Sequence, residues 1–145
     1  MKEKYDVIIV GAGPAGIFTA LELVKMDGID VLMLEKGPDI EERRCYAREN
    51  SCRRCDPCAI TSGWGGAGAF SDGKLSLSPK VGGWLDEYVG EERLIKLISR
   101  VDQLYQEFGA PDEIYGSDEA KIAEWQERAV LSGLILTPCP FRHLG

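Results

Sequence analysis

Apolar runs and a helical stripe follow one another in the first 37 residues. Residues 4–10 predict a buried strand, because four consecutive apolar residues precede a glycine. Residues 14–27 predict a helix that stops at Gly28, and residues 30–35 predict a second strand. Strand, helix and strand in this order predict a βαβ unit over residues 1–37, with the two strands parallel.

The second half of the chain is patterned for helices. Residues 91–108 predict an amphipathic helix, since one apolar stripe at helical spacing holds Leu94, Leu97, Ile98, Val101, Leu104, Tyr105 and Phe108. A second helix is predicted over residues 117–132, with Ser117 as its N-cap and Gly133 as its stop. Residues 134–136 predict a short strand.

Three glycines follow the first strand in the spacing G-x-G-x-x-G. Gly11 permits a tight turn out of the strand, Gly13 lets the backbone approach a pyrophosphate, and Gly16 lets the helix pack closely on the sheet. The start of the helix adds unpaired N–H groups and a partial positive charge. A glycine turn without a ligand is the alternative interpretation.

Glu35 ends the second predicted strand, 19 positions after Gly16. Dinucleotide-binding units place an acid for the adenosine ribose at a spacing of about 20 residues. The carboxylate can accept hydrogen bonds from ribose hydroxyls and would repel a 2′-phosphate, which disfavours NADP at this site. The unit alone does not separate FAD from NAD.

A second glycine-rich loop covers residues 61–73. Five glycines in 11 positions exceed what core packing explains, and they cost conformational entropy. Such a loop suits a backbone that lies against a flat or anionic ligand, and a ligand-free loop is the alternative. Trp64 and Phe70 either flank a flavin or anchor the loop. Asp72 and Lys74 at its exit are weak catalytic candidates for proton transfer or flavin tuning, against a solvated surface pair.

A cysteine segment precedes this loop with the spacing C-x6-C-x2-C-x2-C, formed by Cys45, Cys52, Cys55 and Cys58. Two-residue spacings let thiolates converge on one ion, so these four are candidate ligands of an Fe–S cluster or zinc. A redox pair at Cys55 and Cys58, whose thiolate Arg53 and Arg54 would favour, is a second interpretation. Unligated thiols are the third.

These segments resemble a known family. VIIVGAGPAG with LEKG is similar to the N-terminus of FAD-dependent oxidoreductases of the glutathione-reductase-like superfamily. The cysteine segment, SGWGGAGAFSDGKL, VGGW and PFRHLG resemble the bacterial FAD-dependent, or NAD/FAD-utilising, dehydrogenases. The resemblance implies FAD, held by Gly11, Ala12, Gly13, Pro14, Ala15 and Gly16 at the pyrophosphate, by Glu35 with Lys36 at the ribose, and by the backbone of Gly65, Gly66, Ala67 and Gly68.

The expected architecture is therefore an α/β fold. It begins with a Rossmann-like βαβ unit that binds FAD or NAD(P) with a parallel sheet, followed by a glycine-rich loop and two amphipathic helices. We assign residues 45–74 to cysteine-rich and glycine-rich cofactor loops, and residues 85–145 to a helical segment that begins a substrate or cap region. Because the late glycine-aspartate segment of the resembling family is not found, we expect residues 1–145 to be the N-terminal part of a longer flavoprotein.

Composition and charge narrow the partners. With 145 residues, 44% hydrophobic and 28% charged, the chain has an ordinary globular composition. A net charge of −7 without a basic stripe argues against nucleic-acid binding. No apolar run is long enough for a signal peptide or a membrane span, which predicts a cytoplasmic protein without a membrane partner. We expect a small-molecule substrate, and the sequence does not fix the oligomeric state.

The first functional hypothesis is an FAD-dependent dehydrogenase that passes a hydride or electrons through the flavin, with NAD(P)H as a candidate donor. The second is a non-catalytic nucleotide-binding module with the same fold. The third is an electron-transfer unit in which a cysteine-bound Fe–S cluster relays electrons from the flavin.

Overall fold

The computed structural model describes residues 4–48 and 50–144. The chain divides into two compact units, the first ending at Ser71 and the second beginning at Asp72. The first unit carries the strand-helix-strand pattern and both glycine-rich segments. The second carries the two long helices and a small antiparallel sheet.

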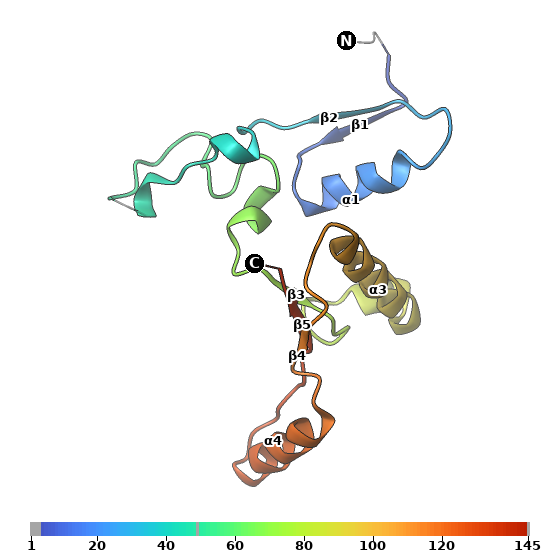
Figure 1. The fold of residues 1–145 in the computed structure, drawn as a ribbon, viewed down its shortest axis with the longest axis vertical. Coiled ribbons are helices and arrows are strands. Elements are labelled where there is room, and N and C mark those ends of the chain that lie inside the picture. The colour runs from blue at the N-terminus through green and yellow to red at the C-terminus, as the bar shows by residue number, and fades with distance from the viewer. Residues whose placement is uncertain (1–3, 49, 145) are drawn as a thin grey trace. The chain divides into compact units, whose positions relative to one another are not determined.

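The first unit begins with β1 (Val7–Val10), α1 (Pro14–Leu23) and β2 (Val31–Leu34), which lie side by side in Figure 1. The two strands are parallel, with Val7 opposite Val31 and Val10 opposite Leu34. Buried Ile9 packs toward α1, whereas Ile8 and Val10 expose the other face of the sheet. The predicted α/β class with a Rossmann-like βαβ unit is confirmed, although α1 ends four residues earlier than predicted.

Three short 3-10 helices follow in the first unit. They are η1 (Ile40–Glu42), η2 (Tyr46–Arg48) and η3 (Gly66–Phe70). The carboxylate of Asp39 accepts a hydrogen bond from the Ile40 amide at the start of η1. η1 and η2 therefore lie among the charged residues after Pro38, and the end of the second glycine-rich segment is also helical.

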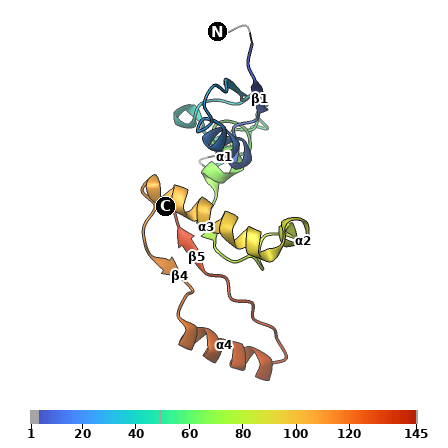
Figure 2. The ribbon, with the colours of Figure 1, turned by 90° about the vertical axis from the view of Figure 1, so that its right-hand side faces the viewer.

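The second unit contains β3 (Lys74–Ser76), α2 (Leu85–Val89), α3 (Glu91–Glu107), β4 (Ile114–Tyr115), α4 (Glu119–Leu131) and β5 (Phe141–His143). β5 is the central strand and runs antiparallel to both neighbours, so that Leu75 and Ile114 lie opposite Arg142 from its two sides. Figure 2 shows α4 on the long connection from β4 to β5.

The predicted helices form, with two corrections at their ends. α3 buries Leu94 and Leu104 of the predicted stripe, but Phe108 is exposed just beyond its last turn. α4 is capped by Asp118, not Ser117: the Asp118 carboxylate accepts a hydrogen bond from the Lys121 amide at 3.1 Å. Asp and Ser are equally good caps, so the sequence did not separate these neighbours.

The predicted strand over residues 134–136 is wrong. These residues belong to no strand, and the Ile135 side chain is 95% exposed. The strand of this region is β5, which begins at Phe141 after Pro140 and pairs with β3 and β4. A short apolar run predicts a strand only where a pairing edge is available, and here the pairing falls seven residues later.

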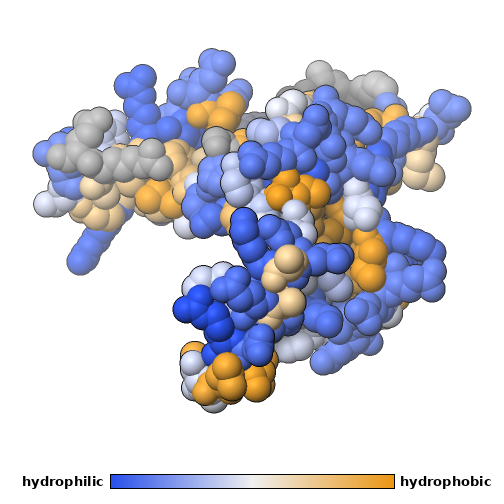
Figure 3. Space-filling view, turned by 60° about the horizontal axis from the view of Figure 1, so that its bottom comes forward, coloured by the Kyte–Doolittle hydropathy of each residue, from blue (hydrophilic) through white to orange (hydrophobic). Residues whose placement is uncertain are grey.

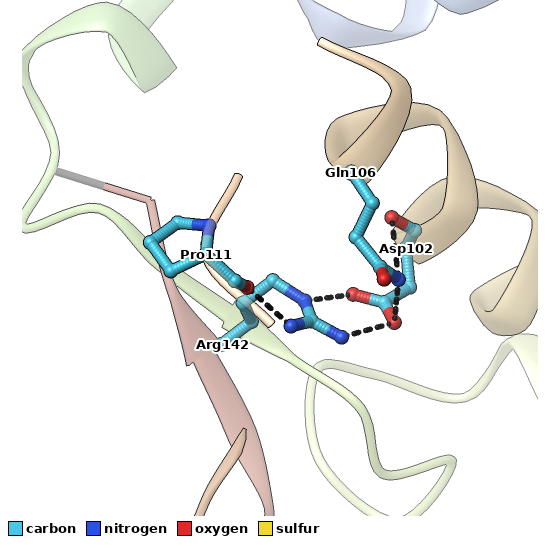
Figure 4. A network of polar contacts seen from close by, with 4 residues as sticks. All are labelled: Asp102, Gln106, Pro111 and Arg142. Atoms are coloured by element: carbon cyan, nitrogen blue, oxygen red, sulfur yellow. Dashed lines mark hydrogen bonds and ion pairs between the residues drawn. The ribbon is translucent and has the colours of Figure 1, made fainter. Parts of the chain in front are cut away.

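A buried network joins α3 to β5 in the second unit, as Figure 4 shows. The Arg142 side chain is only 3% exposed and donates from Nε to Asp102 Oδ1 at 2.6 Å and from Nη2 to Asp102 Oδ2 at 2.8 Å. It also donates from Nη1 to the Pro111 carbonyl, and Gln106 donates to Asp102 Oδ2 at 3.0 Å. The Arg142 hydrogen bonds lower the pKa of the Asp102 carboxyl.

Apolar side chains also reach the surface, and Figure 3 shows orange patches among the polar residues of one face. On α4 and the residues after it, the exposed ones include Trp125, Val130, Leu131, Leu134 and Ile135. None of the helices in residues 4–48 and 50–144 has the length and hydropathy needed to cross a membrane.

Candidate functional site

The candidate site is a cradle of backbone groups in the first unit. We call residues 11–16 the first glycine turn and residues 63–66 the second glycine loop. Glu35, at the end of β2, and Arg43, just after η1, hold these two segments. These four parts lie within a stretch of 56 residues, from Gly11 to Gly66.

The first glycine turn connects β1 to α1. Gly11 has a φ of +100° and donates its N–H to the Leu34 carbonyl at 2.7 Å, so the turn leaves the strand sharply. A Cβ on Gly16 would lie 2.1 Å from the Gly11 carbonyl oxygen, which only glycine avoids. A Cβ on Gly13 would meet nothing of the described protein closer than 4.0 Å. Gly11 and Gly16 are therefore required by the fold, and Gly13 leaves space.

The same turn presents unpaired backbone donors. Because α1 begins at Pro14, the amides of Ala15 and Gly16 lie in its first turn and have no carbonyl partner within the helix. Within the described chain, the Gly13 amide makes no backbone hydrogen bond either. These three N–H groups, with the positive end of the helix dipole, form the kind of site that binds phosphate oxygens.

Glu35 links the two glycine segments through its carboxylate. Oε2 accepts the Ala12 N–H at 2.7 Å, and Oε1 accepts the N–H groups of Gly37 and Gly63, each at 2.9 Å. The amide of Ala12, followed by those of Gly37 and Gly63, lowers the pKa of the Glu35 carboxyl. A carboxylate offers about four lone-pair positions, so roughly one remains for a ribose hydroxyl. The ribose contact stays a prediction; the link between the two segments is a role that the sequence did not reveal.

The second glycine loop lies directly on the first glycine turn. The Gly65 N–H donates to the Ala12 carbonyl at 2.8 Å, and a Cβ on Gly66 would lie 2.9 Å from Gly13 Cα. Gly63, Gly65 and Gly66 all have positive φ values. The glycines of this loop therefore serve a turn conformation and a close backbone approach at once.

Arg43 is the residue of the site that sequence reasoning missed. It is 6% exposed, and its guanidinium donates five hydrogen bonds to backbone carbonyls. Nε and Nη2 bind the Ala59 carbonyl at 2.9 and 2.8 Å, and Nη2 also binds Ile60 at 2.9 Å. Nη1 binds the Trp64 and Gly66 carbonyls at 2.6 and 2.8 Å. In the sequence Arg43 is one of two adjacent arginines in a charged stretch, so no pattern singled it out.

The other residues predicted to touch FAD surround this cradle. Lys36 is exposed beside Glu35, and Pro14 lies against Gly68, whose Cβ would be 3.3 Å from Pro14 Cγ. Ala67 is exposed in η3. The two aromatic residues of the loop differ in their surroundings. Phe70 lies under the Arg43 guanidinium, whose Cζ is 4.7 Å from the centroid of the Phe70 ring. Trp64 is 40% exposed. The contact of Phe70 with Arg43 favours an anchoring role for that ring.

The cysteine segment is not assembled as a metal centre in the described residues. Cys45 is half-buried, Cys52, Cys55 and Cys58 are exposed, and no group of three or more potential ligands converges there. The Fe–S or zinc prediction gains no support from this geometry. At Cys58, the amide of Ile60 first, then the amide and hydroxyl of Thr61, and finally the charge of Arg43 lower the pKa of the thiol. The arginine that lowers the pKa of the Cys58 thiol is Arg43. Arg53, which the sequence suggested for this role, stacks on the Tyr46 ring.

Asp72 and Lys74 lie in the second unit, where they form a surface ion pair. Lys74 Nζ is 2.9 Å from Asp72 Oδ2, and both side chains are more than half exposed. The Lys74 hydrogen bond lowers the pKa of the Asp72 carboxyl. Lys74 begins β3 opposite His143 on β5. The geometry is that of the solvated pair which the sequence left as the alternative to a catalytic role.

Comparison with known proteins covers the part of this cradle that precedes the second glycine loop. Residues 4–45 match the family model described as an FAD binding domain. The matched range contains the first glycine turn, Glu35 and Arg43. An uncharacterized protein of Clostridium beijerinckii is 41% identical over 79 residues, which are 53% of this chain and 15% of that protein.

Two further relatives have a reductase name. A digeranylgeranylglycerophospholipid reductase of Methanosarcina mazei is 35% identical over 102 residues, 65% of this chain and 25% of that protein. Digeranylgeranylglycerophospholipid reductase 2 of Methanococcoides burtonii is 55% identical over 40 residues, 28% of this chain and 10% of that protein. The chain thus spans a tenth to a quarter of these relatives. No solved structure matches.

Proposed function

We propose that the protein is an FAD-dependent oxidoreductase, and that the cradle of the first unit holds the adenosine diphosphate part of FAD. The observation that carries the proposal is the interlocked pair of glycine segments, which leaves the Gly13, Ala15 and Gly16 amides open at a helix start. That turn falls in the segment similar to an FAD binding domain. Relatives with a reductase name support the redox class.

In this proposal the protein binds and orients, and FAD supplies the hydride or electron transfer when bound. The open amides of the first glycine turn bind the pyrophosphate oxygens. The remaining lone pair of Glu35 accepts one ribose hydroxyl, with exposed Lys36 beside it. Gly13 supports this placement, because an added Cβ there would meet nothing of the described protein closer than Gly66 Cα at 4.0 Å.

The finer parts of the proposal rest on the sequence alone, that is, on the resemblance and on the composition and charge. They are a glutathione-reductase-like dehydrogenase, NAD(P)H as electron donor, a small-molecule substrate and a cytoplasmic location, without nucleic acid or membrane. The lipid in the names of these relatives is not carried over, because the matches cover only a tenth to a quarter of those proteins. A non-catalytic nucleotide-binding module and a flavin with an Fe–S relay are the competing outcomes of the test.

The visible spectrum of the protein, purified without oxygen, tests this function. We expect a flavin spectrum that dithionite or NAD(P)H bleaches and that an electron acceptor restores. A colourless protein that added FAD does not reconstitute would overturn the proposal. Bound flavin that no donor reduces supports the non-catalytic module, and stoichiometric iron and sulfide with an EPR signal support the relay.

A matched pair of variants locates the flavin. Glu35→Gln replaces one acceptor oxygen by an NH2 group that faces backbone N–H donors, so we expect FAD affinity to fall about tenfold or more. Glu41→Gln makes the same change on an exposed residue of η1 and should leave the affinity unchanged. Equal affinities of the two variants would place the FAD elsewhere.

A further inference from the structure

Arg43 brings a buried positive charge into the cradle that forms no ion pair with a carboxylate of the described chain. All five of its N–H donors bind backbone carbonyls, and none of the carboxylates in the described chain forms an ion pair with it. A guanidinium stays protonated in proteins, so the charge cannot be lost. Burying an ion without a counter-ion is costly, and Arg43 has carbonyls and the Phe70 ring as partners in place of a carboxylate, which is unusual in a purely structural role.

The hydrogen bonds of Arg43 lead to the first glycine turn. Nη1 donates to the Trp64 carbonyl at 2.6 Å, and the N–H of the same peptide group belongs to Gly65. That N–H donates to the Ala12 carbonyl at 2.8 Å, and the next peptide N–H is the open amide of Gly13. Hydrogen bonds joined end to end through peptide groups polarise one another. The positive charge therefore strengthens Gly13 as a donor.

We propose that Arg43 is a positioning residue for the anionic pyrophosphate, acting on the Gly13 amide through the Trp64–Gly65 and Ala12–Gly13 peptide groups. This inference rests on the proposed function, because it names how the same cradle favours a diphosphate. Arg43 does not touch the ligand; its five donors are used on carbonyls. The planar guanidinium, with its five donors, is needed to reach four carbonyls at once, so a lysine is not equivalent to Arg43.

The test compares ADP with adenosine as probes of the purified chain, by titration of wild type and variants. Both probes carry the ribose, and only ADP carries the pyrophosphate. For Arg43→Met we expect the ADP affinity to fall about fivefold more than the adenosine affinity, since loss of the charge weakens the Gly13 donor. Arg43→Lys should restore part of this ratio. Arg44→Met removes the same charge from an exposed neighbour and should leave the ratio unchanged.

Two results would overturn the inference while the proposed function stands. In the first, Arg43→Met lowers both affinities by the same factor, which shows a merely structural clamp. In the second, Arg44→Met changes the ratio as much as Arg43→Met, which shows a general charge effect. Wild-type protein that binds neither FAD nor ADP would instead refute the proposed function.

A measurement on wild type keeps the inference testable if Arg43→Met does not fold. In an isotope-labelled sample, ADP should move the amide proton resonances of Gly13 and Gly65 downfield together, because the two are linked through the Ala12 carbonyl. The Asp6 amide, which binds the Asp30 carbonyl before β1 and is not linked to Arg43, is the internal control and should not move. A shift at Gly13 without one at Gly65 contradicts the relay.

Discussion

Among the residues whose burial the structure describes, each unit buries one arginine, and the two arginines are satisfied in opposite ways. Arg142 of the second unit meets a carboxylate through two hydrogen bonds, so its charge is cancelled on the spot. Arg43 of the first unit donates only to carbonyls and lies over the Phe70 ring, so it forms no ion pair with a carboxylate. A cancelled charge ties α3 to β5. An arginine without an ion pair, near backbone amides without a partner, favours an anionic ligand. This difference between Arg142 and Arg43 separates a structural network from a binding site.

The largest effect is expected when the ion pair of Asp102 with Arg142 is broken. Asp102→Ala leaves Arg142 buried without its carboxylate, and the side chain of Asp102 is itself only 14% exposed. Removing one partner of a buried pair costs about 3 kcal/mol or more. We expect the free energy of unfolding of the second unit to fall by that amount, measured by denaturant titration with hydrogen exchange of α3 and β5.

Glu92→Ala is the matched control for this prediction. Glu92 is also a carboxylate on α3, but its side chain is 87% exposed and pairs only with exposed Lys96. Its removal should leave the transition unchanged within error, because exposed ion pairs contribute little. If the two variants unfold alike, the Arg142 network is not what joins α3 to β5.

A pair of alanine substitutions separates what the first unit needs for folding from what it needs for a ligand. Gly16→Ala puts a Cβ 2.1 Å from the Gly11 oxygen and should destabilise the unit by about 2 kcal/mol. Gly13→Ala meets nothing within 4.0 Å, so we expect less than about 0.5 kcal/mol. Gly13→Ala should nevertheless weaken FAD binding, measured by flavin titration of the folded protein. Unchanged FAD affinity in Gly13→Ala would contradict a pyrophosphate at this turn.

Acid should weaken the Asp102–Arg142 ion pair of the second unit gradually, as the Asp102 carboxylate becomes protonated. Because the Arg142 hydrogen bonds lower the pKa of Asp102 in the folded protein, its stabilising contribution is complete above the unfolded value of about 4. It is lost as the pH falls through the lower folded value. Hydrogen exchange of α3 should therefore be constant from about pH 7 to 5 and accelerate, relative to the intrinsic rate, only below about pH 4. In Asp102→Asn this acid-dependent part should disappear.

Local patterns predicted the parts of the molecule that depend on local chemistry. The apolar run before Gly11 gives β1, the spacing to Glu35 gives the βαβ unit, and the stripe through Leu94 and Leu104 gives α3. The strand at Phe141 was missed, since its partners lie about 67 residues earlier in β3 and about 27 residues earlier in β4. Pairing between strands so far apart in the sequence leaves no recognisable pattern in the residues of the strand itself.

The candidate site divides in the same way. Gly11, Gly13 and Gly16 follow from backbone geometry and a known spacing. The three amides on Glu35 and the carbonyls on Arg43 could not be predicted, because their partners lie in turns whose shape depends on the folded unit. Arg43 and Arg44 are adjacent and identical in type, yet one is buried and the other is exposed. Only the path of the chain after η1 distinguishes them.

The smallest effect is expected at the surface pair of the second unit. Lys74→Met breaks the ion pair with Asp72, but both side chains are more than half exposed, so stability should not change measurably. If the pair is only a solvated contact, flavin affinity, redox potential and turnover should also equal those of wild type. A shifted flavin potential in Lys74→Met would give this unit a charge that acts on the cofactor. The contrast between a structural second unit and a binding first unit would then fail.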